Sequence, residues 1–249
     1  MKTKQKAFNR KGLILPIIFF WVLNYTQAQT SEETLSKSFD LAIGKESLEI
    51  NNGTIHINEF RILNNKHRYY PTDKFEAGTV TYNNQNYYDV AIKYDIYKDA
   101  IIYRPQASDA VSLNLIQDKV TSFSINNKKF VYLHSLSLPL AQLKTGYYEE
   151  NVLGKKFIFY IRHHRDKREV LKGSSVFHEF DDNYEYFIKK EGNFHKISTK
   201  KDIIKLFPEY KRKINDFYFS SKKLLKTDEP LFYEKLMTYL NNATENYAD

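Results

Sequence analysis

The fold is decided by an eleven-residue stretch in the first half of the chain, YYDVAIKYDIY, which spans Tyr87–Tyr97. Its side chains alternate in character, with a period of two residues. The apolar set, which we predict to share one buried face, is Tyr88, Val90, Ile92, Tyr94 and Ile96. The polar set, predicted to face solvent, is Asp89, Lys93 and Asp95. This period is typical of a β-strand with one face buried.

Turn signals on both sides of this stretch extend it into an antiparallel pattern. The run Asn83–Asn86 predicts a hairpin between Thr79–Tyr82 and Tyr87–Tyr97. Asn126-Asn127 predicts a second tight turn, because asparagine tolerates a positive φ angle. Further short strands are predicted at Ala100–Arg104, Val111–Leu115, Val120–Ile125, Lys128–Leu133, Lys155–Arg162, Val176–Phe180, Tyr184–Lys190 and Asn193–Ile197. About nine to eleven closely spaced strands favour an antiparallel sheet, sandwich or barrel.

The last fifty residues change to a helical period. Thr199–Asp202 fits a capping box, and Pro208 is expected to end the first helix or open the next. A second helix is predicted at Tyr210–Phe219, with Ile214 and Phe217 facing inward. A third is predicted at Pro230–Asn242 and carries the apolar positions Phe232, Leu236, Tyr239 and Leu240. We therefore predict a mainly β fold with a small α-helical C-terminal module.

The sequence predicts four segments. Residues 1–28 form a signal peptide, 29–45 a polar lead-in, 46–198 the antiparallel β domain, and 199–249 a helical module packed on that domain.

The first segment has the three parts of a secretory signal. Five basic and no acidic residues precede an apolar run, Leu13–Leu23, and small residues stand at Thr26 and Ala28. The run is shorter than the roughly 20 residues that a membrane span needs. We expect cleavage after Ala28 and a periplasmic or cell-surface location, with no transmembrane span in the mature chain.

Removal of this segment changes the charge. The whole chain carries +8, and residues 1–28 hold five of its basic residues, which leaves +3 for the rest. The net charge of the mature chain therefore gives no support for nucleic-acid binding. The chain contains no cysteine, so its stability depends on a packed core.

Several short stretches resemble a pattern found in exported β-rich proteins of flavobacteria and related Bacteroidetes. They are Gly78–Tyr82, Tyr87–Val90, Lys93–Asp99, Asp118–Val120 ahead of Phe123, Gly146–Glu149 and Leu206–Pro208. The resemblance covers roughly residues 75–225. It implies a periplasmic or cell-surface protein and supplies no catalytic residues.

The usual motifs of enzymes are missing from the sequence. Gly173-Ser174-Ser175 lacks the second glycine of a nucleophile elbow and is predicted to be a plain loop. There is no phosphate-binding loop among the eight glycines. We assign no catalytic residue and no cofactor, and the ligand-binding residues stay open.

The histidines do not form a metal-binding pattern. His163 and His164 are adjacent, so on a strand they point to opposite faces and cannot chelate one ion. His178 precedes acidic residues but lacks the spacing of a zinc site. We predict no metal site.

The acidic residues on and just after the decisive strand do not have the spacing of an acid–base pair. Asp89 and Asp95 are about 20 Å apart along an extended strand, too far for such a pair. Asp99 is predicted to start a turn, although calcium ligation with Asp95 is an alternative without the usual spacing.

Basic residues gather in the C-terminal module. They are Lys200, Lys201, Lys205, Lys211, Arg212, Lys213, Lys222, Lys223 and Lys226. Such a run is often the solvent-exposed face of amphipathic helices. The alternative interpretation is a surface that binds an anionic envelope glycan or lipid.

Three function classes follow. The leading one is a non-enzymatic envelope protein that binds a partner, another envelope protein or an anionic component, or contributes to surface structure. The second is a binder of a small apolar ligand or lipid inside a barrel-like cavity of about 300–1,000 Å³. The third is a hydrolase whose site is assembled from distant residues, with titratable groups that converge in a cleft.

Overall fold

The structure is a computed structural model that describes residues 33–44, 47–106, 111–135 and 143–245. The chain divides into two compact units, Met1–Leu48 and Glu49–Asp249. In the first unit, residues 33–43 form a helix with an ion pair between Glu33 and Lys37. The predicted signal peptide and its cleavage site lie outside the described residues.

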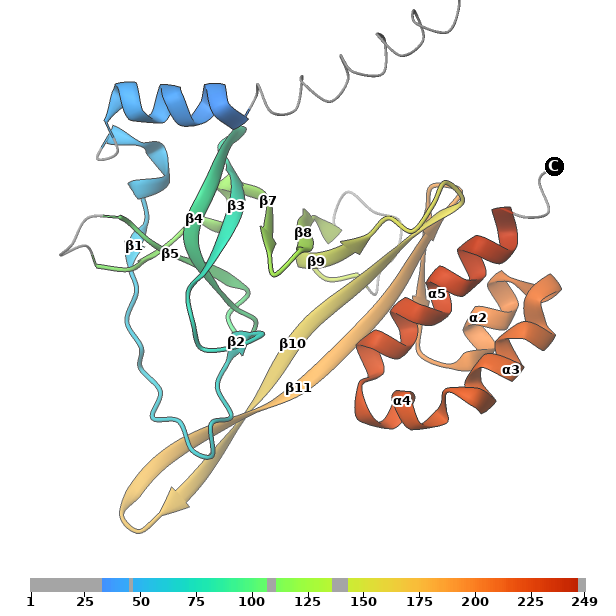
Figure 1. The fold of residues 1–249 in the computed structure, drawn as a ribbon. Coiled ribbons are helices and arrows are strands. Elements are labelled where there is room, and N and C mark those ends of the chain that lie inside the picture. Colours follow the sequence, from blue (N-terminus) through green and yellow to red (C-terminus); the bar gives the residue numbers. More distant parts are fainter. Residues whose placement is uncertain (1–32, 45–46, 107–110, 136–142, 246–249) are drawn as a thin grey trace, which may run out of the picture. The chain divides into compact units, whose positions relative to one another are not determined.

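The second unit is built on one open sheet of twelve strands in which every strand pair is antiparallel (Figure 1). The strands are β1 (Thr54–Ile55), β2 (Tyr69–Tyr70), β3 (Glu76–Tyr82), β4 (Gln85–Asp95), β5 (Ala100–Arg104), β6 (Leu113–Asn114), β7 (Val120–Ile125), β8 (Lys128–Leu133), β9 (Gly146–Asn151), β10 (Phe157–Lys172), β11 (Ser175–Lys190) and β12 (Asn193–Ile197). Their order is β1-β6-β5-β4-β3-β7-β8-β9-β10-β11-β12, and β2 pairs with β4. The predicted mainly β, antiparallel fold class is confirmed, and the sheet does not close into a barrel.

Most of the decisive stretch forms β4, which ends at Asp95, so the prediction that the strand continues to Tyr97 was wrong. The turn before it and the start of β4 show a second difference. Asn83 and Asn84 make the turn to β3 with positive φ angles of 50° and 64°. Tyr88 and Asp89 together oppose one residue of β3, which is a β-bulge, and Asp89 has a φ of 53°. The extra residue reverses the alternation, so Tyr87 is buried and Tyr88 is only half-buried. The assignment of Tyr88 to the buried face was therefore wrong.

The hairpin β10–β11 is longer than the sequence predicted. Its strands pair without interruption from Phe157↔Lys190 to Lys172↔Ser175, about 50 Å along each strand. Gly173, with a φ of 64°, lies in the turn at its tip, where a loop was predicted. Val176–Phe180 and Tyr184–Lys190, predicted as two strands, are parts of β11.

The connection between β1 and β2 runs along the outer half of this hairpin with its residues 61–66. The His178 N–H donates to the Arg61 carbonyl (2.8 Å), and the Leu63 N–H donates to the His178 carbonyl (3.1 Å). The Phe180 N–H donates to the Lys66 carbonyl (3.1 Å). This segment gives backbone partners to a part of β11 that lies beyond its pairing with β12.

In the described part of the chain, four α-helices and a 3₁₀ turn follow the sheet, whereas two or three helices were predicted. They are α2 (Lys200–Leu206), η6 (Pro208–Tyr210), α3 (Lys211–Ser220), α4 (Lys222–Thr227) and α5 (Glu229–Glu245). The capping box at Thr199 and Asp202 is present, and Pro208 opens the 3₁₀ turn. Among the described residues, no helix is both long and apolar enough to cross a membrane.

The helices pack against one face of β10–β12. Phe157, Phe159 and Ile188 of the sheet share a core with Ile214 and Leu236 of the helices. Tyr160, Phe187 and Phe194 lie in a separate, smaller core. The alternation of side chains along β10–β12 therefore supplies two cores, and the helices cover the larger one.

Candidate functional site

Asp95 lies in the interior, which corrects the prediction that it faces solvent. Its side chain is 1% exposed, and its Oδ2 lies 2.6 Å from Nε of Arg68. Its Oδ1 accepts hydrogen bonds from the N–H groups of Tyr97 (3.1 Å) and Lys98 (3.0 Å). Burial raises the pKa of Asp95, although these donors and Arg68 oppose that effect. The carboxylate is buried because it is paired.

Arg68 itself is fully buried, and it fixes the segment before β2 to the end of β4. Its guanidinium lies over the rings of Phe60 and Tyr69, 4.8 Å and 5.0 Å from their centroids. The carboxylate of Asp95 neutralises the charge of the guanidinium, and the two rings cover its planar faces. The pair Arg68–Asp95 is thus part of the packing of this segment.

Asp99 lies in the predicted turn, with a φ of 53°. Its carboxylate accepts hydrogen bonds from the hydroxyl of Tyr94 (2.6 Å) and the N–H of Tyr147 (3.2 Å). Burial raises the pKa of Asp99, and the hydrogen bond from Tyr94 opposes this. A Cβ at Gly146 would overlap the Asp99 carboxylate, so the glycine makes room for it. This carboxylate closes the turn onto β9.

The adjacent histidines point in different directions, as predicted from the strand geometry. His163 is buried and His164 is half-exposed. Nε2 of His163 lies 2.7 Å from Oε2 of Glu149 and shares a hydrogen bond with it. The ring of His163 also contacts the ring of Tyr70, with 4.7 Å between centroids.

Glu149 is the centre of an ionic network that sequence reasoning missed. Its Oε1 accepts from Nζ of Lys128 (2.8 Å) and Nδ2 of Asn151 (3.1 Å). Lys128 also donates to Oε1 of Glu234 (2.7 Å), so the network joins β8, β9 and β10 to α5. No linear motif marks it, because its members are far apart in the chain and meet only through the register of the strands.

The pKa values of the two carboxyl groups in this network are shifted in opposite directions. Burial opposes ionisation of Glu149, but the hydrogen bonds from His163 and Lys128 outweigh it and lower its pKa. Burial raises the pKa of Glu234, and Lys128 opposes that shift. Opposite shifts are typical of acid–base sites. However, Glu149 is 1% exposed and both its oxygens are occupied, so it holds α5 to the sheet and has no surface for a substrate.

His178 lies against the ring of Phe60, with 5.0 Å between centroids, and its Nε2 is 3.8 Å from Oε1 of Glu169. In the part of the chain that the structure describes, no three His, Asp or Glu side chains are placed to hold a metal ion.

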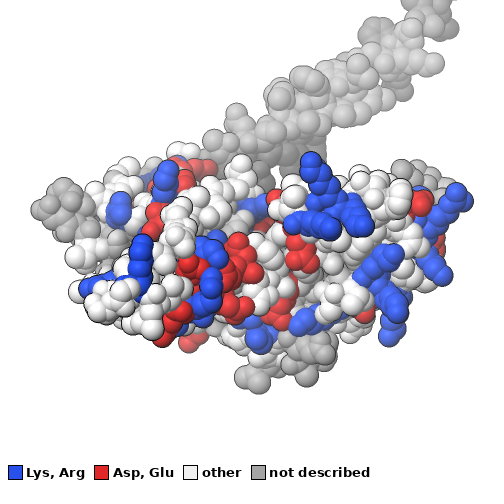
Figure 2. All heavy atoms as spheres, turned by 90° about the horizontal axis from the view of Figure 1, so that it is seen from below, with Lys and Arg blue, Asp and Glu red and all other residues white. Residues whose placement is uncertain are grey.

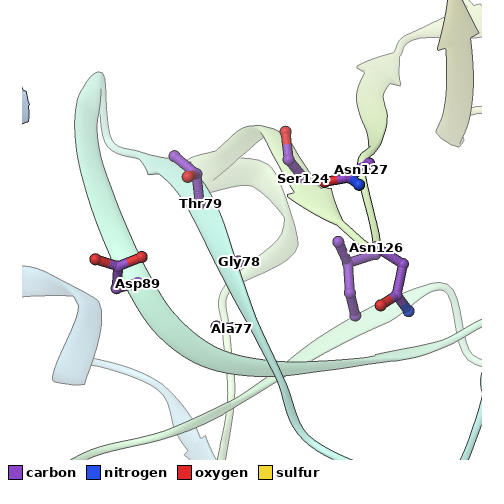
Figure 3. A pocket seen from close by; sticks show the side chains of 8 residues that line it. Ala77, Gly78, Thr79, Asp89, Ser124, Asn126 and Asn127 are labelled. Carbon is purple, nitrogen blue, oxygen red and sulfur yellow. The ribbon is translucent and has the colours of Figure 1, made fainter. Parts of the chain in front are cut away.

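A shallow, solvent-open hollow of about 350 Å³ lies beside β3, β4 and β7 (Figure 3). Its lining is Ala77, Gly78, Thr79, Asp89, Ser124, Ile125, Asn126 and Asn127. Most of these side chains are polar or small, so the hollow lacks the apolar walls that a lipid-sized ligand requires.

The helices α2–α4 carry a large excess of positive charge. Between Lys200 and Thr227 the chain has nine basic and three acidic residues, a net charge of +6. In Figure 2, Lys and Arg side chains gather on the side of the helices. One cluster of these basic residues lies on α3 and α4, and we call it the basic helical surface. It consists of Lys211, Arg212, Lys222, Lys223 and Lys226. These five are exposed, and none forms an ion pair with another described residue.

The helices that carry this surface are nearly continuous. The Ser221 N–H donates to the Phe217 carbonyl (2.9 Å), and the Leu225 N–H donates to the Ser221 carbonyl (3.1 Å), across the junction of α3 and α4. Ile214, Phe217 and Leu224 pack toward the core. The basic side chains therefore project from the opposite side of the same helical path.

Phe219 projects with them and was not recognised in the sequence. Its side chain is 88% exposed. The usable signal was its spacing from Ile214 and Phe217, which places it away from the apolar side of a helix.

In the comparisons with known proteins, no protein-family model, curated protein or solved structure matches the chain.

Proposed function

We propose that this chain is an exported, non-enzymatic binding protein of the cell envelope. It attaches to an anionic component of the envelope through the basic helical surface. The observation that carries the proposal is the separation of charge. Residues 200–227 carry +6, whereas residues 29–199 and 228–249 together carry −3. A local excess of this size attracts polyanions although the mature chain is only weakly basic.

The free state of these cations supports the same proposal. Several lysines on the sheet, such as Lys93, Lys128 and Lys196, form ion pairs with carboxylates of the protein, which partly neutralise their charge. The basic helical surface keeps its charge available, and each cation near an anionic surface contributes about 1 kcal/mol of attraction.

Export remains a prediction from the leader, and it accords with the resemblance to exported proteins of flavobacteria. From the leader and the resemblance together, we infer that the protein binds its anionic partner in the cell envelope.

The two alternatives have less support. An apolar ligand was expected inside a barrel-like cavity, and the sheet is open. A hydrolase was expected to show titratable groups that converge in a cleft. The group around Glu149 converges, but its hydrogen bonds are satisfied within the protein.

A pair of charge-reversal variants tests the proposal. The first carries Lys222→Glu, Lys223→Glu and Lys226→Glu on α4. The control carries the same charge change at Lys74, Lys155 and Lys172, which are exposed residues outside the helices. Elution from immobilised dextran sulfate in a salt gradient is measured. We expect the wild type to be retained, the helical variant to elute much earlier, and the control to elute near the wild type. Equal shifts for both variants, or a wild type that is not retained, would contradict the proposal.

A further inference from the structure

Phe219 is the most exposed of the large apolar side chains that the structure describes. A single exposed apolar residue is ordinary on a protein surface. What sets Phe219 apart is its setting within the basic helical surface. Along the nearly continuous path of α3 and α4, Lys222 and Lys223 follow it by three and four residues, and Lys226 follows by seven. Arg212 precedes it by seven.

This spacing places the phenyl ring and the cations on one side. Residues three, four and seven positions apart lie on the same face of a helix. The acidic residue on this face is Asp216, and it is outnumbered by the cations around it. An apolar side chain in the middle of a cationic face is typical of helices that lie in the plane of a membrane interface.

We propose that the basic helical surface docks on an anionic lipid bilayer, with Phe219 inserted between the lipid headgroups. This inference rests on the proposed function and names the anionic component. Lipid phosphates lie where the lysine side chains end, and the acyl layer beneath them accepts an apolar ring. A soluble glycan or another polyanion offers the charge without the apolar layer, so it would leave Phe219 in water.

The proposed contact is peripheral and reversible. Its electrostatic part weakens as the ionic strength rises, because the Debye length shortens from about 10 Å at 0.1 M salt to about 3 Å at 1 M. Insertion of one phenyl ring adds an apolar part that salt does not screen.

The first experiment compares Phe219→Ser with Leu171→Ser. Leu171 is 78% exposed at the tip of β10–β11, so both variants remove a large exposed apolar side chain without opening a cavity. Each protein is floated with vesicles of equal parts phosphatidylglycerol and phosphatidylcholine, and with pure phosphatidylcholine vesicles. Retention on dextran sulfate is measured in parallel.

We expect the wild type and Leu171→Ser to bind the anionic vesicles equally and not to bind the neutral vesicles. Phe219→Ser should bind the anionic vesicles about tenfold or more weakly, the loss that corresponds to withdrawing one large apolar side chain from an apolar layer. Its retention on dextran sulfate should not change.

The outcomes separate this inference from the proposed function. If Phe219→Ser binds anionic vesicles as the wild type does, the inference fails and polyanion binding through charge remains. If the wild type binds dextran sulfate but not anionic vesicles, the partner is a polyanion other than a bilayer, and the inference also fails. If the wild type binds neither, the proposed function itself fails.

A fluorescent reporter gives an independent readout. Trp21, the only tryptophan of the chain, lies in the predicted signal peptide, so the mature protein with Phe219→Trp carries one tryptophan, at the proposed insertion point. Anionic vesicles should shift its emission to the blue, and brominated lipids should quench it. Unchanged emission in the presence of bound vesicles would overturn the insertion of residue 219.

Discussion

At the scale of single residues, the charged side chains in the interior of this protein are held by specific partners. Glu149 has three donors, from Lys128, Asn151 and His163, and it is 1% exposed. A carboxylate in this position stabilises the fold only while its partners are in place, because an unpaired buried charge is costly. The network therefore connects the stability of the sheet to the attachment of α5.

We predict that Glu149→Gln lowers the free energy of unfolding by about 2–3 kcal/mol, because Lys128 and His163 lose the charge that they face in the interior. The matched control is Glu150→Gln on the same strand: its ionic partner Lys129 is well exposed, and the glutamine amide oxygen can still accept the hydrogen bond from the hydroxyl of Tyr160. It should cost less than about 1 kcal/mol. Urea denaturation at neutral pH measures both, and equal losses would show that Glu149 has no special role.

The lowered pKa of Glu149 predicts how this contribution depends on pH. A carboxyl group with a folded-state pKa below the unfolded value of about 4.3 adds stability above that value. The contribution is lost as the pH falls through the folded-state pKa. Glu234 has a raised pKa and acts in the opposite sense, so the comparison is made in a Glu234→Gln background.

In that background, the difference in unfolding free energy between Glu149 and Glu149→Gln should be largest near neutral pH and shrink below about pH 4. Denaturation at a series of pH values measures it. A difference that grows toward low pH would contradict the assignment of Glu149 as an ionised acceptor.

At the scale of elements, the long hairpin β10–β11 combines two different kinds of support. Its inner half lies against the helices, with Phe159 and Ile188 in the core. Its outer half carries charged pairs across the strands, such as Arg165 Nε to Asp182 Oδ1 (2.7 Å), and contacts the segment 61–66. The outer half thus depends on contacts from a distant part of the sequence.

We predict that Phe60→Ala loosens this outer half without unfolding the rest. The Phe60 ring contacts His178 and Phe180, with centroid distances of 5.0 Å and 5.4 Å, and it covers Arg68. Amide exchange at Leu63 and His178 should become at least about tenfold faster, which corresponds to roughly 1.4 kcal/mol of local stability.

Exchange at the turn end of the β3–β4 hairpin, the end opposite to Asp95, serves as the internal control for Phe60→Ala and should stay the same. Uniform acceleration over the whole sheet would show instead that the segment unfolds only together with the core.

The hairpin also shows where prediction from sequence succeeds and where it stops. The bounds of β5, β7, β8 and β12 were predicted correctly, because apolar alternation ends there at clear turn signals. In β10, the charged run from Arg165 to Glu169 interrupts the alternation, so the prediction ended at Arg162 although the strand continues. Its continuation depends on cross-strand partners and on segment 61–66, which no local pattern reveals.

The candidate site divides in the same way. The basic residues of α3 and α4 were recognised from composition, because a cluster of like charges is visible in a linear sequence. The Glu149 network was missed because strand register creates it. Asp95 was wrongly predicted to face solvent, because its buried partner, Arg68, is distant in the sequence and no local pattern reveals the pair.

At the scale of the whole molecule, the account rests on an uneven distribution of charge in the second unit. The sheet provides many internal ion pairs, whereas the five cations of the basic helical surface form no ion pair with another described residue and lie next to an exposed phenyl ring. In the proposed function, the sheet provides stability and the helices α3 and α4 contact the partner. It also predicts that the contact is made by one short stretch of the chain.

Hydrogen–deuterium exchange of the mature chain, residues 29–249, with and without vesicles of equal parts phosphatidylglycerol and phosphatidylcholine, tests this central claim most directly. The account predicts that bound vesicles slow exchange in α3 and α4, Lys211–Thr227, and leave the hairpin β10–β11 and the hollow beside β3 unchanged. Protection located on the sheet or the hairpin tip, with α3 and α4 unchanged, would contradict it.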